Sequence, residues 1–186
     1  MAYHAPLTRY ARILHDGGVI AYPTEGVYGL GCLASRPDAV QRIVELKGRD
    51  AGKGLIMIAS DPYQLEGWVA MADPEELLRR DGDRARTWIV AAGPLATPEV
   101  TGGRPTVAVR VTRHPVAAGL CAAAGEPLIS TSANRSGRPA IVRATVLRSV
   151  FGPLVDAIVP GALGSAKGPS EIVDFETGRV LRPAAD

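Results

Sequence analysis

Residues 127–137 read Pro-Leu-Ile-Ser-Thr-Ser-Ala-Asn-Arg-Ser-Gly, an apolar run that passes directly into hydroxyl and amide side chains. The run at 127–131 is short, apolar and bounded by turn residues, which predicts a buried strand. Helices are predicted on both sides of it, at His114–Ala124 and Ala144–Phe151. A buried strand between two helices indicates an α/β fold, in which helices cover a sheet.

The same alternation of strands and helices continues in both directions from this stretch. Further helices are expected at Pro6–Asp16 and Pro37–Leu46, and one or two surface helices in the acidic stretch 61–81. The glycine-rich stretches Thr24–Gly31 and Pro160–Pro169 are expected to be loops. The remaining strands are expected at Val19–Tyr22, Leu55–Ala59, Thr87–Ala91, Thr106–Val111, Ala157–Val159, Glu171–Phe175 and Arg179–Leu181.

Bulk composition narrows the function classes. With 46% hydrophobic and 22% charged residues, the chain has the composition of a globular protein, and residues 1–186 are expected to form one domain. No apolar run approaches the length of a membrane span, and the first ten residues lack a signal-peptide core, so a cytoplasmic protein without a membrane partner is expected. Cys32 and Cys121 lie far apart without a CxxC pattern, and the three histidines lack ligand spacing. Neither a disulfide nor a metal site is therefore expected.

The net charge of +2 conceals an uneven distribution along the chain. Between residues 61 and 83 acids dominate, whereas arginines dominate between residues 100 and 155. The arginines of the second segment are Arg104, Arg110, Arg113, Arg135, Arg138, Arg143 and Arg148. If they share a surface, that surface attracts polyanions such as nucleotides or RNA. The alternative is that the asymmetry averages out in space.

Three loops concentrate the polar groups that could carry chemistry. The first, Thr24–Gly31, offers a threonine hydroxyl and three glycines that permit close approach of a ligand, although most glycine-rich loops are simple turns. The second, Lys47–Gly54, holds three cations that could converge on a triphosphate; capping of the preceding helix is the alternative. The third, Ser130–Gly137, suits phosphate, ribose or amino-acid groups, or is a turn that caps a helix.

None of these loops has the pattern of a P-loop or of a dinucleotide-binding turn. No serine has a histidine near it in the sequence, and the carboxylates show no pairing motif, which argues against covalent hydrolase chemistry. The loops instead favour electrostatic binding of an anionic substrate, as adenylyl transfer requires.

The ordered set of segments resembles the YrdC-like threonylcarbamoyl-AMP synthase family. The segments YPTEGVYGLGC, ELKGRDAGKGLIMIA, TVAVRV, PLISTSANRSGRP, PSEIVDF and VLRP follow the family's order and extend over nearly the whole chain. The family's KxR and SxN signatures appear as Lys47-Gly48-Arg49 and Ser132-Ala133-Asn134.

The resemblance implies a fold and a reaction. The implied fold is an α/β domain with a twisted mixed sheet, flanked by helices, around a large positively charged concave cavity, in the family's short single-domain form. The implied enzyme is a nucleotidyltransferase that joins L-threonine, bicarbonate and ATP, with Mg²⁺, into threonylcarbamoyl-AMP and pyrophosphate. A partner protein complex would then transfer the threonylcarbamoyl group to tRNA, giving N6-threonylcarbamoyladenosine (t6A).

The resemblance also implies roles for individual residues. The implied catalytic set is Lys47, Arg49, Ser132 and Asn134. The implied ATP-binding positions are Lys47, Arg49, Thr87, Ser132, Asn134 and Arg182. The implied threonine-binding positions are Thr24, Arg110, Ser130 and Ser170. No metal-binding residue is implied.

One segment departs from the family's pattern. The family usually has WPGPxT before its central strand, whereas residues 82–87 read Gly-Asp-Arg-Ala-Arg-Thr, so that only Thr87 remains. Either Arg84 and Arg86 take over phosphate contacts, or this wall of the pocket is incomplete and the catalytic rate is affected.

Two other functions remain open. A non-catalytic protein could use the same basic cavity to bind double-stranded RNA or tRNA through backbone charge, although an aromatic content of 5% gives little support for base stacking. A carbamoyl-adenylate enzyme of hydrogenase maturation would need acylphosphatase and zinc-finger segments, which this sequence lacks.

Overall fold

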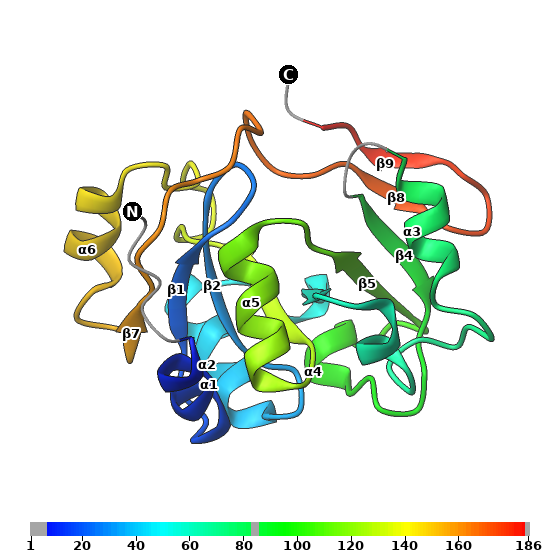
Figure 1. Ribbon diagram of the computed structural model, residues 1–186, viewed down its shortest axis with the longest axis horizontal. Coiled ribbons are helices and arrows are strands. Elements are labelled where there is room, and N and C mark those ends of the chain that lie inside the picture. Colours follow the sequence, from blue (N-terminus) through cyan, green and yellow to red (C-terminus); the bar gives the residue numbers. More distant parts are fainter. Residues whose placement is uncertain (1–6, 83–85, 185–186) are drawn as a thin grey trace.

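The computed structural model describes residues 7–82 and 86–184, which build one nine-stranded mixed sheet (Figure 1). The α-helices are α1 Thr8–His15, α2 Pro37–Lys47, α3 Glu76–Asp81, α4 Pro98–Thr101, α5 Pro115–Ala124 and α6 Ala144–Phe151. The short 3-10 helices are η1 Ala51–Lys53 and η2 Pro62–Leu65. The strands are β1 Ile20–Pro23, β2 Tyr28–Leu33, β3 Ile56–Ala59, β4 Thr87–Ala91, β5 Thr106–Val111, β6 Leu128–Ser132, β7 Ala157–Ile158, β8 Ile172–Asp174 and β9 Val180–Arg182.

The strand order is β7-β1-β2-β6-β3-β5-β4-β8-β9. The pairs β1–β7, β3–β5 and β4–β8 are parallel, and the other five neighbouring pairs are antiparallel. The expected α/β class with a mixed sheet is therefore confirmed. Every helix and strand that was expected outside the acidic stretch is present, with ends that shift by one or two residues.

One strand was wrongly expected to be a loop. The stretch Tyr28–Leu33 is a fully buried strand, β2, which pairs with β1 and β6 in the middle of one half of the sheet. Its glycines lower its strand propensity, but they are needed for packing. A Cβ atom on Gly31 would lie 2.5 Å from the carbonyl oxygen of Ile129 and 2.8 Å from the ring of Tyr22. Glycine at position 31 therefore lets the Ile129 carbonyl and the Tyr22 ring pack closer to the β2 backbone than a residue with a Cβ atom would allow.

The acidic stretch differs from the expected surface helices. It forms η2 and the short α3, while Leu65, Trp68 and Val69 are buried in the main core. The four-residue helix α4 was not expected either. Its residue Val100 is fully buried in the same core.

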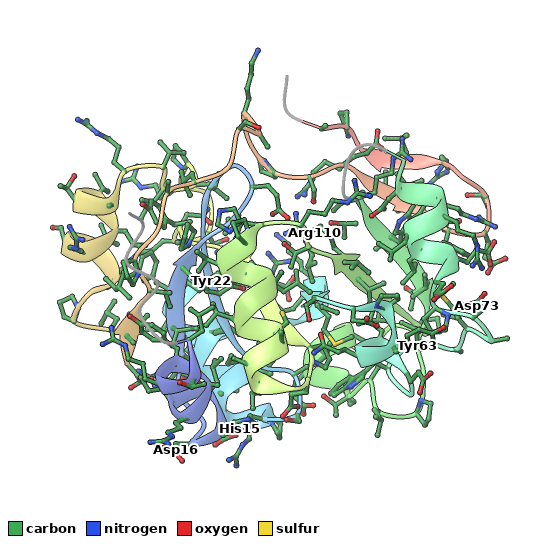
Figure 2. All side chains as sticks on the ribbon, viewed as in Figure 1. His15, Asp16, Tyr22, Tyr63, Asp73 and Arg110 are labelled. Atoms are coloured by element: carbon green, nitrogen blue, oxygen red, sulfur yellow. The ribbon has the colours of Figure 1, made fainter. Side chains whose placement is uncertain are left out.

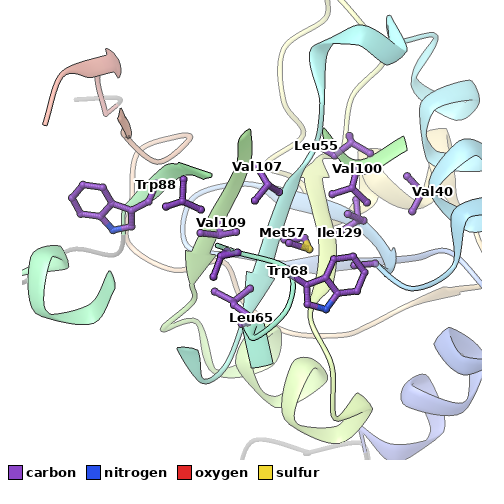
Figure 3. Close-up of a cluster of buried hydrophobic side chains, with 14 of the residues drawn as sticks. Val40, Leu55, Met57, Leu65, Trp68, Trp88, Val100, Val107, Val109 and Ile129 are labelled. Atoms are coloured by element: carbon purple, nitrogen blue, oxygen red, sulfur yellow. The ribbon is translucent and has the colours of Figure 1, made fainter. Parts of the chain in front are cut away.

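Adjacent residues of the central strands β3 and β6 face two different hydrophobic cores, since side chains alternate between the faces of a sheet. On one face, Met57 of β3 and Ile129 of β6 pack with residues of α2 and α4 (Figure 3). On the other face, the adjacent residues Ile58 and Leu128 pack with residues of α1 and α5. A third, smaller core joins α6 to β1 and β2.

Residues 160–169 form a strap that runs from β7 towards β8, drawn in orange across the upper part of Figure 1. Backbone hydrogen bonds attach the strap to the β1–β2 hairpin loop: Gly164 donates to Thr24 and Ala166 donates to Glu25. A Cβ atom on Gly26 would lie 2.5 Å from the carbonyl oxygen of Gly168. The hairpin loop and the strap therefore pack backbone against backbone.

Candidate active site

Three loops meet at one end of the neighbouring strands β2, β6 and β3, because β6 runs antiparallel to both of the others. These are the hairpin loop before β2, the loop after β6, and the loop that joins α2 to β3. Together with β5, the strap, and the segments next to β8 and β9, they border a cavity of about 1210 Å³. The cavity lies on the sheet face that carries α5, since Ala108 and Arg110 of β5 line it while Val109 packs into the opposite core.

Cations outnumber acids among the described residues that line this cavity. The cationic residues are Arg49, Lys53, Arg86, Arg104, Arg110, Arg113, Lys167 and Arg182, and the acidic residues are Glu25 and Glu171. Such an excess attracts anions. The arginine-rich segment contributes only in part, because Arg135, Arg138, Arg143 and Arg148 are exposed near α6 and do not line the cavity.

Lys47 connects the two signature motifs directly. It is the last residue of α2 and is only 4% exposed. Its Nζ donates to the carbonyl oxygens of Ser132 and Asn134 and, at 3.0 Å, to Oδ1 of Asn134. Oδ1 of Asn134 also accepts from the hydroxyl of Ser132 at 2.6 Å. Burial and the neighbouring charge of Arg49 lower the pKa of Lys47 to about 8.

Lys47, Arg49, Ser132 and Asn134 also line a second, smaller cavity of about 120 Å³. Arg49 and Ser132 line both cavities, so they lie where the two adjoin. Arg49 donates to the carbonyl oxygen of Gly54 at 2.9 Å, which leaves most of its guanidinium donors free. Burial lowers the pKa of Arg49; Asp50 opposes this effect and Arg104 adds to it.

The residues implied to bind threonine lie on the walls of the larger cavity. Thr24, Arg110, Ser130 and Ser170 all line it. Arg110, the penultimate residue of β5, is 9% exposed and lies between α5 and the β4–β8 side of the sheet (Figure 2). Its NH1 lies 3.5 Å from Oε2 of Glu25, which comes from the hairpin loop. A cation thus lies beside the implied threonine-binding hydroxyls.

Thr87 occupies a different place from the one that the resemblance implies for a nucleotide contact. It is fully buried and does not line either cavity. Its hydroxyl lies 2.7 Å from the hydroxyl of Ser170, and the carbonyl of Ser170 accepts from Arg182 at 2.7 Å. In this structure Thr87 therefore supports two residues that line the cavity.

The arginines of the cavity have donors without partners. Nε of Arg49, Arg110 and Arg182 is buried and makes no hydrogen bond to the described residues. Burial lowers the pKa of Arg182, and the charges of Arg110 and Arg49 lower it further. The three guanidinium groups repel one another and keep donors without partners. A bound anion would reduce the repulsion and accept hydrogen bonds from these donors.

The departure from the family's pattern at residues 82–87 can be followed only in part, because Arg84 lies outside the described residues. Arg86 lines the cavity, but its Nε donates to Glu171 at 2.8 Å and its NH1 donates to the carbonyl of Arg80 at 2.7 Å. The pairing with Glu171 engages the Arg86 charge, which under one of the two alternatives for this segment would contact phosphate.

Some lining residues were missed by the sequence analysis. Glu25 and Lys167 border the cavity, but they lie in loops where sequence does not determine which way a side chain points. Glu25 adjoins Thr24 in the segment YPTEGVYGLGC, and this position was the available signal.

The described residues contain no group of three or more His, Cys, Asp or Glu side chains that could hold a metal ion. Cys32 and Cys121 are both buried and unpaired, and burial raises the pKa of both thiols, for Cys121 to about 12. Over the part of the chain that the structure covers, no helix is long and apolar enough to cross a membrane.

These features define an α/β protein with a large cavity in which cations outnumber acids among the described lining residues, a composition that attracts anionic ligands. The family model Sua5_yciO_yrdC, described as "Telomere recombination", matches residues 12–184. The chain belongs to this Sua5/YciO/YrdC family.

Individual relatives agree with this membership. The threonylcarbamoyl-AMP synthase of Nitrosococcus oceani is 47% identical, over 92% of this chain and 94% of the relative. That of Thiobacillus denitrificans is 46% identical, over 91% and 90%. Among solved structures, P. abyssi Sua5 complexed with L-threonine is similar with a TM-score of 0.88 and 31% identity, covering 96% of this chain and 54% of that one.

Proposed function

We propose that this protein is a nucleotidyltransferase that forms threonylcarbamoyl-AMP, pyrophosphate and water from L-threonine, bicarbonate and ATP, with residues 1–186 acting as one cytoplasmic domain. Relatives that share more than 40% of their residues over nearly the full chain carry the name of this activity. The observation that carries the proposal is that the KxR and SxN motifs meet beside the same cavity that holds Arg110 and Arg182.

The nucleotide side of the proposed site consists of Lys47, Arg49, Ser132, Asn134 and Arg182. Arg49 and Arg182 have the unused donors that phosphate oxygens require. Lys47 holds Ser132 and Asn134 in place through its hydrogen bonds and adds positive charge. Mg²⁺ enters with ATP as part of the substrate complex.

The amino-acid side consists of Thr24, Arg110, Ser130 and Ser170, with the Arg110 guanidinium as the partner of the threonine carboxylate. Thr87 acts through its hydrogen bond to Ser170. With the α-carboxylate on Arg110, the carbamate formed from the threonine amino group and bicarbonate would present its own oxygen to the α-phosphate of ATP. The protein aligns this oxyanion for attack and neutralises the charge of the departing pyrophosphate.

The test is pyrophosphate release by the purified protein with ATP, Mg²⁺, bicarbonate and L-threonine, and with threonine or bicarbonate omitted in turn. The proposal requires release that depends on both. Absence of release while ATP and threonine still bind in a calorimeter would mean that the altered wall at residues 82–86 has removed catalysis.

The product would be used by a protein complex that transfers the threonylcarbamoyl group to tRNA to make t6A. A mixed carbamic–phosphoric anhydride is reactive towards water, so a class of reaction that consumes it promptly must follow. The alternative function, binding of double-stranded RNA or tRNA in the basic cavity, predicts RNA affinity with steep salt dependence and no turnover of ATP.

A further inference from the structure

The two carboxylates of the cavity are in different states of hydrogen bonding. Glu171 accepts from Nε of Arg86 at 2.8 Å, so its charge has a direct partner. Glu25 accepts from the hydroxyl of Thr112 at 2.6 Å through Oε1. Its other oxygen, Oε2, is buried and has no hydrogen-bond partner among the described residues. A buried carboxylate oxygen without a donor is costly and needs an explanation.

Arg110 is the cation closest to this oxygen, but it does not satisfy it. The ion-pair distance from NH1 to Oε2 is 3.5 Å, and no hydrogen bond joins the two groups. Nε of Arg110 is itself a buried donor without a partner. An unsatisfied acceptor thus lies beside an unsatisfied donor, and both residues line the same cavity.

A ligand that satisfies both groups must present an acceptor to Arg110 and a donor to Glu25 a short distance apart. The carboxylate and ammonium groups of an α-amino acid meet this requirement, since they are attached to the same carbon atom. A simple carboxylate would satisfy Arg110 alone and would place a second negative group near Glu25.

We propose that Glu25 binds the ammonium group of the incoming amino acid, before the carbamate forms on that nitrogen, so that Glu25 and Arg110 together select a zwitterion. This inference rests on the proposed function, and it adds a specificity-determining residue that the motif comparison did not assign. The strap and the hairpin loop fix the position of Glu25, because its carbonyl accepts from Ala166 at 2.9 Å.

The charge of Glu25 suits this role. Burial acts to raise the pKa of this carboxyl, but the charge of Arg110 and the hydrogen bond from Thr112 outweigh it and leave the pKa below its ordinary value. Glu25 is therefore ionised at neutral pH and can only accept hydrogen bonds. The side chain is 24% exposed, so part of it is open to the cavity.

A different role for Glu25 would be to hold the Arg110 guanidinium in place without touching the substrate. The two roles differ in their effect on ligands without an amino group. A positioning role makes Glu25 equally important for every carboxylate that binds Arg110, whereas the proposed role makes it important only for ligands that carry the ammonium group.

The experiment compares the binding of L-threonine and 3-hydroxybutyrate, which is threonine without its amino group, by NMR titration in the absence of ATP. In Glu25→Gln, L-threonine affinity should fall by about 10- to 100-fold, as expected for loss of a hydrogen bond between charged groups. The affinity for 3-hydroxybutyrate should stay the same or increase. Equal weakening of both ligands, or no change in either, would overturn the proposal.

Two further variants complete the design. Glu171→Gln removes the same charge from the same cavity, but its carboxylate already has Arg86 as a partner, so L-threonine affinity should change less than about threefold. Thr112→Val removes the hydrogen bond that orients Glu25 and should reproduce the selective loss at a smaller size, which provides a test if Glu25→Gln does not fold. If the wild-type protein binds no L-threonine at all, the proposed function itself fails, which is a different result from unselective binding by the variant.

Discussion

Binding of ATP should be accompanied by uptake of a proton by Lys47, in an amount that depends on pH. The Lys47 ammonium is buried beside Arg49, and its pKa of about 8 lies below the ordinary value of 10.5. The sign follows from this shift. In the free protein the charged form is disfavoured, and a phosphate group close to Nζ favours it again, so the bound state holds more protons than the free state.

The magnitude follows from the two pKa values. If the charge of a nearby phosphate returns the pKa of Lys47 to about 10.5, the uptake is about 0.1 proton at pH 7, about 0.5 at pH 8 and about 0.9 at pH 9. The same shift affects folding in the absence of ATP. Because protonation of Lys47 is disfavoured in the folded state, its contribution to the free energy of unfolding should increase as the pH rises from about 8 towards 10.5.

The assay is titration calorimetry with a non-hydrolysable ATP analogue at each pH, in two buffers of different ionisation enthalpy. The difference between the two binding enthalpies, divided by the difference between the two buffer ionisation enthalpies, gives the number of protons taken up. Lys47→Met should abolish the uptake at pH 8 and 9. Lys53→Met is the matched control, because Lys53 lines the larger cavity but is exposed, so the uptake should persist. Uptake that is absent in the wild type, or that persists in Lys47→Met, would refute the reasoning.

Three further substitutions test the site and the fold. Arg49→Met should weaken ATP binding by about 10- to 100-fold in calorimetry. The urea midpoint should stay nearly unchanged, since Arg49 donates only one hydrogen bond among the described residues, to Gly54. A large loss of stability would show that Arg49 is structural. Thr87→Val should weaken L-threonine binding by about 3- to 10-fold, because Ser170 loses the hydrogen bond that holds its hydroxyl in place. An unchanged affinity would show that this hydrogen bond does not contribute to threonine binding. Gly31→Ala should lower the free energy of unfolding, measured in urea, by at least about 2 kcal/mol, because the new methyl group overlaps the carbonyl oxygen of Ile129. A variant as stable as the wild type would mean that β2 and β6 can move apart to accommodate the methyl group.

Much of the fold could be predicted from the sequence, because strands such as 55–59 and 106–111 are apolar runs with clear boundaries. β2 could not, since its two glycines, Gly29 and Gly31, resemble a loop, and they are needed because β6, which is distant in sequence, packs closely against this strand. The stretch at Leu65–Val69 was misjudged for a related reason: the acids around it suggested a surface, but Trp68 belongs to the core.

The candidate site was predictable as a set of loops but not as an arrangement. Sequence spacing could associate Lys47 with phosphate binding, yet it could not show that its ammonium is held by carbonyl oxygens 85 and 87 residues away. It also could not show that Thr87 is buried beneath Ser170. The first fact depends on how α2 packs against the end of β6, and the second on the parallel pairing of β4 with β8, and local sequence patterns determine neither.

The attachment of the strap has a consequence for how the cavity can change over evolutionary time. Its bonds to the hairpin loop join backbone atoms at Gly164 and Ala166, so they do not depend on the side chains between and after them. Ser165 and Lys167 line the cavity from these positions. New side chains can therefore be tried at these two positions, and the size or charge of the ligand altered, while the path of the chain stays the same.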